Sequence, residues 1–84
     1  MNQIQFLTIP GCHNCEAAKK IFDEVMPEFK DRFEVKEFDM TAPDGQELMQ
    51  KYGVMASPGI IINDELFSTG GVSKEKLLEK LRAL

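Results

Sequence analysis

The chain has 84 residues, enough for one small domain with a single hydrophobic core. Hydrophobic residues make up 43% and charged residues 29% of it, a composition typical of a globular protein rather than a disordered one. The formal net charge of −4 and the lack of a basic run argue against a nucleic-acid partner. No stretch approaches the roughly 20 apolar residues of a membrane span, and the N-terminus does not resemble a secretory signal. We therefore expect a cytoplasmic protein with no membrane partner.

The first predicted element is a buried strand at residues 4–9, rich in β-branched and aromatic side chains. Pro10-Gly11 ends this strand. A helix is predicted over residues 13–26 because apolar side chains repeat there at helical spacing, and Pro27 either ends or kinks it. The apolar face of this helix is formed by Ala18, Ile21, Phe22, Val25, Met26 and Phe29.

Residues 33–39 predict an outer strand with a bulge, because the apolar alternation slips phase at Phe38. A second helix is predicted after Thr41, which forms a capping-box pattern with Asp44. Gly53 is well placed to end that helix as a left-handed cap.

The remaining third of the chain predicts two strands and a helix. Residues 60–62 are three consecutive isoleucines, as expected of a central strand covered on both faces, and residues 66–69 form a short strand after a turn. Gly70-Gly71 leads to Ser73, a good N-cap for the last helix. The element order is therefore βαβαββα. The last helix has an apolar face of Leu77, Leu78, Leu81 and Leu84.

The chain's only two cysteines, Cys12 and Cys15, lie between the first strand and the first helix. Two intervening residues cannot separate the thiols far in a helical first turn, so they can close a small disulfide ring. Unpaired N–H groups and the helix dipole favour a thiolate at this position. A bridge that closes so short a loop constrains the unfolded chain little, which argues against a purely structural disulfide. The motif therefore predicts a reversible redox dithiol.

Three segments, in this order and spacing, resemble the thioredoxin/glutaredoxin superfamily in its short form. They are residues 11–15 with the dithiol, residues 51–58 ending in Ser-Pro before the third strand, and Gly70-Gly71 before the last helix. The resemblance covers nearly the whole chain. It implies a thioredoxin-like α/β fold, a four-stranded mixed sheet flanked by three helices, in one domain spanning residues 1–84.

The resemblance also implies an activity, namely thiol–disulfide exchange that reduces disulfides in proteins or small molecules. Cys12 would be the attacking thiolate and Cys15 the resolving thiol. Pro58 would follow a cis peptide bond, with the Ser57 backbone available to bind an extended substrate.

Departures from the family patterns bear on the electron donor. Phe6 occupies the position of the buried acid of thioredoxins, and His13-Asn14 replaces the Gly-Pro of thioredoxins and the Pro-Tyr of glutaredoxins. Residues 9–11 lack the basic residue that glutaredoxins use for glutathione. The chain is most similar to small, glutaredoxin-sized thioredoxins of prokaryotes. We expect a flavin- and NADPH-dependent reductase as the donor, with glutathione as the alternative.

The roles of His13 and of the glycine pair in the predicted site each have two interpretations. His13 is either an exposed loop residue or an imidazolium that, together with Gly11, tunes the Cys12 thiolate. Gly70 and Gly71 either form a strand-to-helix turn or bring backbone N–H groups close to a substrate.

The alternative to an enzyme is a metal- or cluster-carrying protein. Two cysteines and one histidine cannot complete a four-ligand zinc site or a four-cysteine cluster within one chain, so such a site requires a dimer. We therefore expect a monomer that binds no cofactor and holds a redox-active Cys12–Cys15 disulfide.

Overall fold

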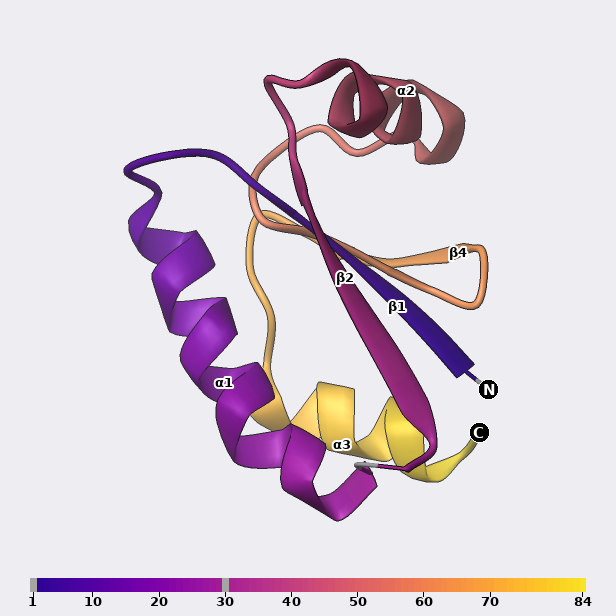
Figure 1. Ribbon diagram of the computed structural model, residues 1–84. Coiled ribbons are helices and arrows are strands. Elements are labelled where there is room, and N and C mark those ends of the chain that lie inside the picture. The colour runs from indigo at the N-terminus through magenta and orange to yellow at the C-terminus, as the bar shows by residue number, and fades with distance from the viewer. Residues whose placement is uncertain (1, 30) are drawn as a thin grey trace.

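A computed structural model describes residues 2–29 and 31–84 (Figure 1). Its order of strands and helices confirms the predicted βαβαββα. None of the helices within these residues is long and apolar enough to cross a membrane. In chain order, the elements are β1 (Asn2–Thr8), α1 (His13–Phe29), β2 (Phe33–Asp39), α2 (Pro43–Tyr52), β3 (Gly59–Ile62), β4 (Glu65–Thr69) and α3 (Lys74–Arg82).

The four strands form one mixed sheet in the order β2-β1-β3-β4. The β1 strand pairs with β2 in parallel and with β3 in antiparallel orientation, and β3 pairs antiparallel with β4. Figure 1 shows α1 and α3 on one face of the sheet and α2 on the other. The two inner strands are therefore covered on both faces, which explains the continuous apolar run in β3.

The core has two parts, one on each face of the sheet, because successive strand side chains point to opposite faces. On the α1 and α3 face, Phe6 packs against Phe22 with ring centroids 5.1 Å apart. On the α2 face, Leu7 and Ile61 pack with Met40 and Val54. The larger part comprises Ile4, Phe6, Ala18, Phe22, Val25, Phe29, Phe33, Ile60, Ile62, Leu77 and Leu81.

The predicted bulge in the outer strand is wrong. The β2 strand pairs with β1 in unbroken register along its whole length, and the sheet irregularity lies instead between Ile60 and Ile61, where β3 pairs with β4. The apparent phase slip arises because Phe33 packs on the α1 face whereas Phe38 packs on the α2 face. A strand with apolar side chains packed on both faces therefore has the same sequence pattern as a bulged strand.

Helix ends also depart from the sequence patterns. Pro27 lies inside α1, which continues to Phe29, so the proline does not end the helix. The N-cap of α2 is Ala42, and the predicted capping box at Thr41 is wrong. The N–H and hydroxyl of Thr41 instead donate to Asp39 Oδ1, at 2.8 and 2.6 Å. The Thr41 hydroxyl therefore bonds to the Asp39 carboxylate and not, as the capping-box pattern predicted, to the N–H groups at the start of α2.

The other two predicted caps have different outcomes. Gly53 ends α2 in the left-handed conformation, as predicted, with φ of 71°. Ser73 occupies the N-cap position of α3, but its side chain makes no capping hydrogen bond. In the last helix Leu77 and Leu81 are buried, whereas Leu84 lies beyond the helix end and is exposed.

Candidate active site

Cys12 caps the N-terminus of α1. Its carbonyl accepts a hydrogen bond from the Glu16 N–H at 3.2 Å, and its Sγ accepts one from the Cys15 N–H at 3.0 Å. The sulfur thus takes the place of the oxygen of an ordinary N-cap side chain, bonded to one of the helix's unpaired first-turn donors. This hydrogen bond and the helix dipole both favour negative charge on Cys12 Sγ.

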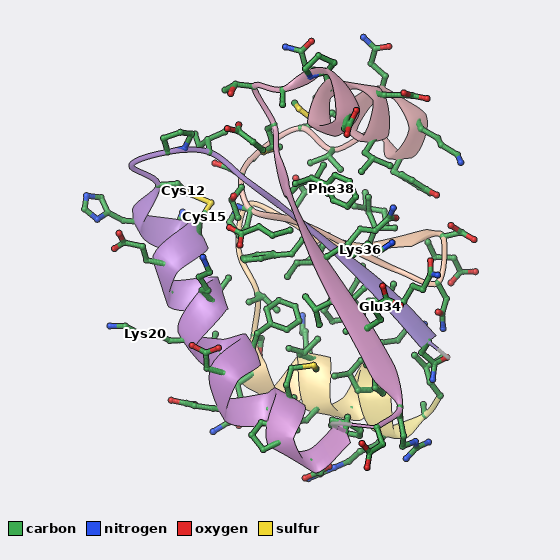
Figure 2. The ribbon with its side chains drawn as sticks, in the orientation of Figure 1. Cys12, Cys15, Lys20, Glu34, Lys36 and Phe38 are labelled. Carbon is green, nitrogen blue, oxygen red and sulfur yellow. A yellow bond between two sulfur atoms is a disulfide. The ribbon has the colours of Figure 1, made fainter. Side chains whose placement is uncertain are left out.

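The two cysteines are joined as a disulfide, with their Cα atoms 5.2 Å apart (Figure 2). They differ in accessibility. Cys12 is half-buried at the start of the helix, whereas Cys15, nearly one turn further in, is only 5% exposed. A molecule that approaches from solvent therefore meets Cys12 before Cys15.

The Ser57–Pro58 peptide bond is cis, as the resemblance implied. Ser57 Oγ lies 3.4 Å from Cys12 Sγ, within hydrogen-bonding distance. The loop before β3 therefore meets the start of α1, although the two segments are far apart in the sequence. Pro58 itself is fully buried and anchors this loop in the fold. Substrate binding by Ser57 and Pro58 stays a prediction.

Thr69, at the end of β4, holds that loop in place. Its hydroxyl accepts hydrogen bonds from the N–H groups of Met55 at 3.3 Å and Ala56 at 3.0 Å, and donates to the Ala56 carbonyl at 2.9 Å. The next residue, Gly70, donates its N–H to the Pro58 carbonyl at 2.9 Å. Sequence reasoning missed Thr69, whose only signal was its position before the glycine pair.

We expect Thr69→Val to loosen the loop beside Cys12. The substitution keeps the shape of the side chain but removes the partner of three backbone groups, which costs about 1–2 kcal/mol in the free energy of unfolding because water replaces part of the bonding. Displacement of Ser57 should also lower kcat/KM for disulfide exchange. Urea unfolding and steady-state kinetics measure the two effects. Thr69→Ser, which keeps the hydroxyl, is the control, and a valine variant as stable and active as wild type contradicts the assignment.

The glycines of the predicted site differ from one another. Gly11 and Gly70 both have positive φ, 73° and 87°, which favours glycine at these turns. The Gly70 carbonyl accepts a weak hydrogen bond from Asn14 Nδ2 at 3.5 Å, a contact that sequence reasoning missed. Gly71 lies in open space without positive φ. The turn interpretation therefore holds for Gly70, and a substrate-facing role for Gly70 and Gly71 stays a prediction. Exposed His13 is the first residue of α1, and its tuning role also stays a prediction.

Both cysteines line a pocket of about 140 Å³ between α1 and the ends of β1 and β2. Its charged side chains are Glu16, Lys19 and Glu37. Lys19 Nζ lies 3.3 and 3.2 Å from the two carboxylate oxygens of Glu37, which also accepts a hydrogen bond from the Thr8 hydroxyl at 3.3 Å. Sequence reasoning missed this cluster, because its members come from three elements and form no motif.

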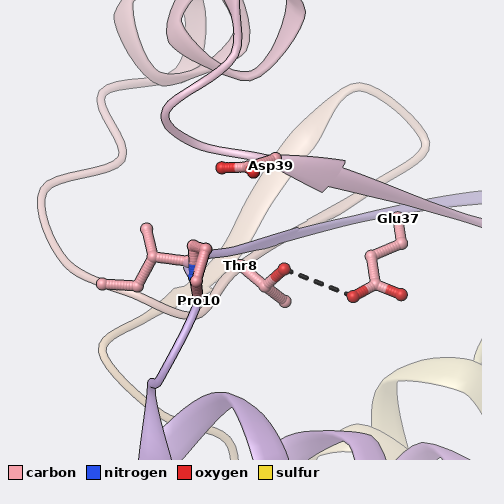
Figure 3. A pocket seen from close by; sticks show the side chains of 5 residues that line it. Thr8, Pro10, Glu37 and Asp39 are labelled. Carbon is pink, nitrogen blue, oxygen red and sulfur yellow. Dashed lines mark hydrogen bonds between the residues drawn. The ribbon is translucent and has the colours of Figure 1, made fainter.

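Two further pockets adjoin the site. One, of about 470 Å³, shares Thr8 and Glu37 with the cysteine pocket and extends to Asp39 (Figure 3). Hydrogen bonds from Thr41 lower the pKa of Asp39 below its ordinary value. The other pocket, of about 240 Å³, is mainly apolar and borders Ser57. Its lining is Ile9, Met40, Thr41, Met49, Met55, Ala56 and Ser57.

Metal-ligating side chains do not cluster in the described part of the chain. Within residues 2–29 and 31–84, no group of three or more His, Cys, Asp and Glu side chains could hold a metal ion.

Comparisons with known proteins agree on one family. A family model for the thioredoxin domain matches residues 2–83. A relative named thioredoxin from Methanocaldococcus jannaschii is 38% identical over 80 residues, covering 95% of this chain and 92% of that protein. A probable thioredoxin from Methanothermobacter thermautotrophicus is 35% identical over 78 residues, covering 93% and 89%.

Solved structures at 17% identity share the fold. Thioredoxin-2, described as a component of the malaria parasite's protein secretion machinery, matches with a TM-score of 0.81 over 100% of this chain and 84% of that chain. An uncharacterised thioredoxin-like protein from Clostridium perfringens matches with a TM-score of 0.83 over 100% and 71%. The domain match, the relatives and the Cys12–Cys15 disulfide together lead to one conclusion. The chain belongs to the thioredoxin family and is a thiol–disulfide oxidoreductase.

Proposed function

We propose that the protein works in the reducing direction, as a protein-disulfide reductase. The Cys12 thiolate attacks a substrate disulfide and forms a mixed disulfide, which Cys15 resolves, leaving reduced substrate and a Cys12–Cys15 bridge. The observation that carries the exchange step is the placement of Cys12 Sγ, half-buried at the N-terminus of α1 and bonded to the Cys15 N–H. That placement favours a reactive thiolate which substrates can reach. The reducing direction is proposed from the likeness to relatives named thioredoxin.

The substrate segment would lie across the loop that contains Ser57 and Pro58. An extended peptide can bind there through the backbone, as peptides do at exposed strand edges. The adjacent apolar pocket suits an apolar side chain next to the substrate cysteine, and Met55 at its rim is 88% exposed. Methionine side chains adapt to irregular partners, which fits an enzyme that acts on many proteins. Gly70 and Gly71 complete the proposed binding surface.

The proposed electron donor is a flavin- and NADPH-dependent thioredoxin reductase. Residues 9–11, next to Cys12, carry no charge that could bind a glutathione carboxylate. Two cysteines at minimal spacing, with no further structural bridges, fit electron transport and redox homeostasis in the cytoplasm. We further propose a monomer that binds no cofactor.

A coupled assay tests the proposal. Oxidised protein is supplied either with NADPH and thioredoxin reductase or with NADPH, glutathione and glutathione reductase, and insulin serves as the disulfide substrate. We expect NADPH consumption and insulin reduction in the first system, and none above the protein-free blank with Cys12→Ser. If insulin is reduced in neither system, the reductase proposal is overturned. If insulin is reduced faster with glutathione, the proposed electron donor is wrong. Metal analysis and an optical spectrum of protein purified without chelator test the cluster-carrier alternative.

A further inference from the structure

The resolving cysteine has to lose a proton in a confined place. Cys15 is 5% exposed, and burial disfavours the charged form of a thiol. Within the described residues no charged or polar side chain is buried, and Phe6 belongs to the apolar core on this face of the sheet. A proton that leaves Cys15 therefore needs an acceptor at the edge of the core rather than inside it.

The pocket beside the disulfide connects Cys15 to that edge. Its volume of about 140 Å³ exceeds the ~10–15 Å³ that one water requires, so water can link the thiol to the polar side chains of the lining. Three carboxylates are near: Glu16 on α1 and Glu37 on β2 line this pocket, and Asp39 lines the adjoining one. The cation is Lys19, four residues after Cys15 and hence on the same side of the helix.

Glu37 is the carboxylate held in place. The Thr8 hydroxyl donates to its Oε1, and Lys19 Nζ contacts both of its oxygens (Figure 3 shows the Thr8 bond). Asp39 instead accepts hydrogen bonds from the N–H and the hydroxyl of Thr41. The side chain of Glu37 is about half exposed, so a proton that it receives can pass on to bulk water.

We propose that Glu37 accepts, through water in this pocket, the proton that Cys15 loses as it resolves the mixed disulfide, an inference that rests on the exchange mechanism of the proposed function. The Cys15 thiolate then attacks Cys12 Sγ, the Cys12–Cys15 bond forms, and the bond to the substrate sulfur breaks. The substrate leaves as a thiolate and takes its proton from solvent, while Glu37 returns its own to solvent. Two electrons pass from the dithiol to the substrate. Lys19 and Thr8 are positioning residues for the carboxylate.

Stopped-flow mixing of the reduced protein with dithiobis(nitrobenzoate) separates the two steps, because each step releases one coloured thiolate. The first phase, attack by Cys12, depends on reagent concentration, whereas the second, attack by Cys15, does not. This leaving group departs readily, so proton loss from Cys15 limits the second phase. At pH 7 we expect Glu37→Gln to slow the second phase by about tenfold or more, since general base catalysis contributes ~10²–10⁴-fold and water replaces part of it.

The pH profile distinguishes a proton acceptor from a structural residue. As pH rises, more Cys15 loses its proton to bulk solvent, so the gap between wild type and Glu37→Gln should narrow to about threefold or less at pH 9. Lys19→Met should slow the same phase, because it releases the carboxylate from its position. The first phase should change less than twofold in Glu37→Gln, because Cys12 attacks the reagent without help from Glu37. Circular dichroism checks that the variant is folded.

Glu34→Gln is the matched control. Glu34 lies on the same strand, three residues away and hence on the opposite face, where it contacts Lys36 at 3.6 Å (Figure 2 labels both residues). The Glu34→Gln variant should leave both phases unchanged.

The proposal is overturned if the second phase of Glu37→Gln is as fast as that of wild type, if the slowing does not depend on pH, or if Glu16→Gln slows the second phase instead. A wild-type second phase that depends on reagent concentration would mean that Cys15 does not attack Cys12, which contradicts dithiol exchange itself and is a separate failure. Should circular dichroism show that Glu37→Gln is unfolded, Glu37→Asp decides, because its shortened carboxylate should slow only the second phase.

Discussion

Cys12→Ser is expected to abolish disulfide exchange, whereas Cys15→Ser should keep the first attack and accumulate mixed disulfides with substrates. The reason lies in the position of the two sulfurs. Cys12 Sγ is the more accessible of the two sulfurs, at the helix N-terminus, and is polarised by the Cys15 N–H, so we expect it to be the nucleophile. Cys15 is buried behind it and has only Cys12 Sγ as its partner. Non-reducing electrophoresis with a substrate protein displays the trapped adduct.

Alkylation kinetics check the same assignment without a substrate. In the reduced protein, iodoacetamide should modify Cys12 much faster than Cys15, because Cys12 is more accessible and its thiolate is favoured by the helix N-terminus. Peptide mapping after brief exposure identifies which sulfur reacted. Equal rates at the two thiols would falsify the division of roles. A Cys15→Ser variant that forms no adduct would show that Cys12 is not the attacking sulfur.

The order of elements could be predicted because this sequence carries local signals for each one. Three consecutive isoleucines, a helical repeat after the cysteines and a glycine suited to the left-handed cap at Gly53 each arise from a single segment. The dithiol could be predicted for the same reason, since Cys12 and Cys15 are neighbours on one helix turn. A substrate-binding role for the Ser57 backbone was predicted only through family resemblance, and the contact of the Ser57 hydroxyl with Cys12 Sγ was not predicted, because no local pattern links residues so far apart.

The remaining features of the site depend on which strands become neighbours. No sequence pattern links Glu37 to Lys19, and the two side chains meet only because β2 pairs with β1 beside α1. In the sequence, Thr69 has the pattern of an ordinary strand residue. Only the position of β4 in the fold brings its hydroxyl to the loop before Pro58. Periodicity also misled at Phe38, because it reports how often side chains change faces but not what covers each face.

Gly45 is a further case in which the sequence and the structure predict opposite outcomes. It lies in the first turn of α2 and is buried against the end of β2. By helix propensity alone, Gly45→Ala should stabilise the protein by about 0.5–1 kcal/mol. In the structure a Cβ at this position would collide with the Asp39 carbonyl oxygen, and would lie 2.6 Å from the Asp39 carbonyl carbon and 2.9 Å from Met40 Cα. These are backbone atoms, so no side-chain rotation relieves the clash.

We therefore expect Gly45→Ala to lower the free energy of unfolding by about 3 kcal/mol, the upper part of the range for overpacked cores. For a domain of this size that corresponds to a fall in Tm of roughly 12–24 °C. Gly71→Ala is the control, because a Cβ there meets no atom within 4 Å, and its effect should stay within about 0.5 kcal/mol. Urea and thermal unfolding of both variants measure the difference. A Gly45→Ala protein as stable as wild type would mean that α2 does not approach β2 this closely, and with it the placement of Asp39 and Thr41 beside the active site would have to be revised.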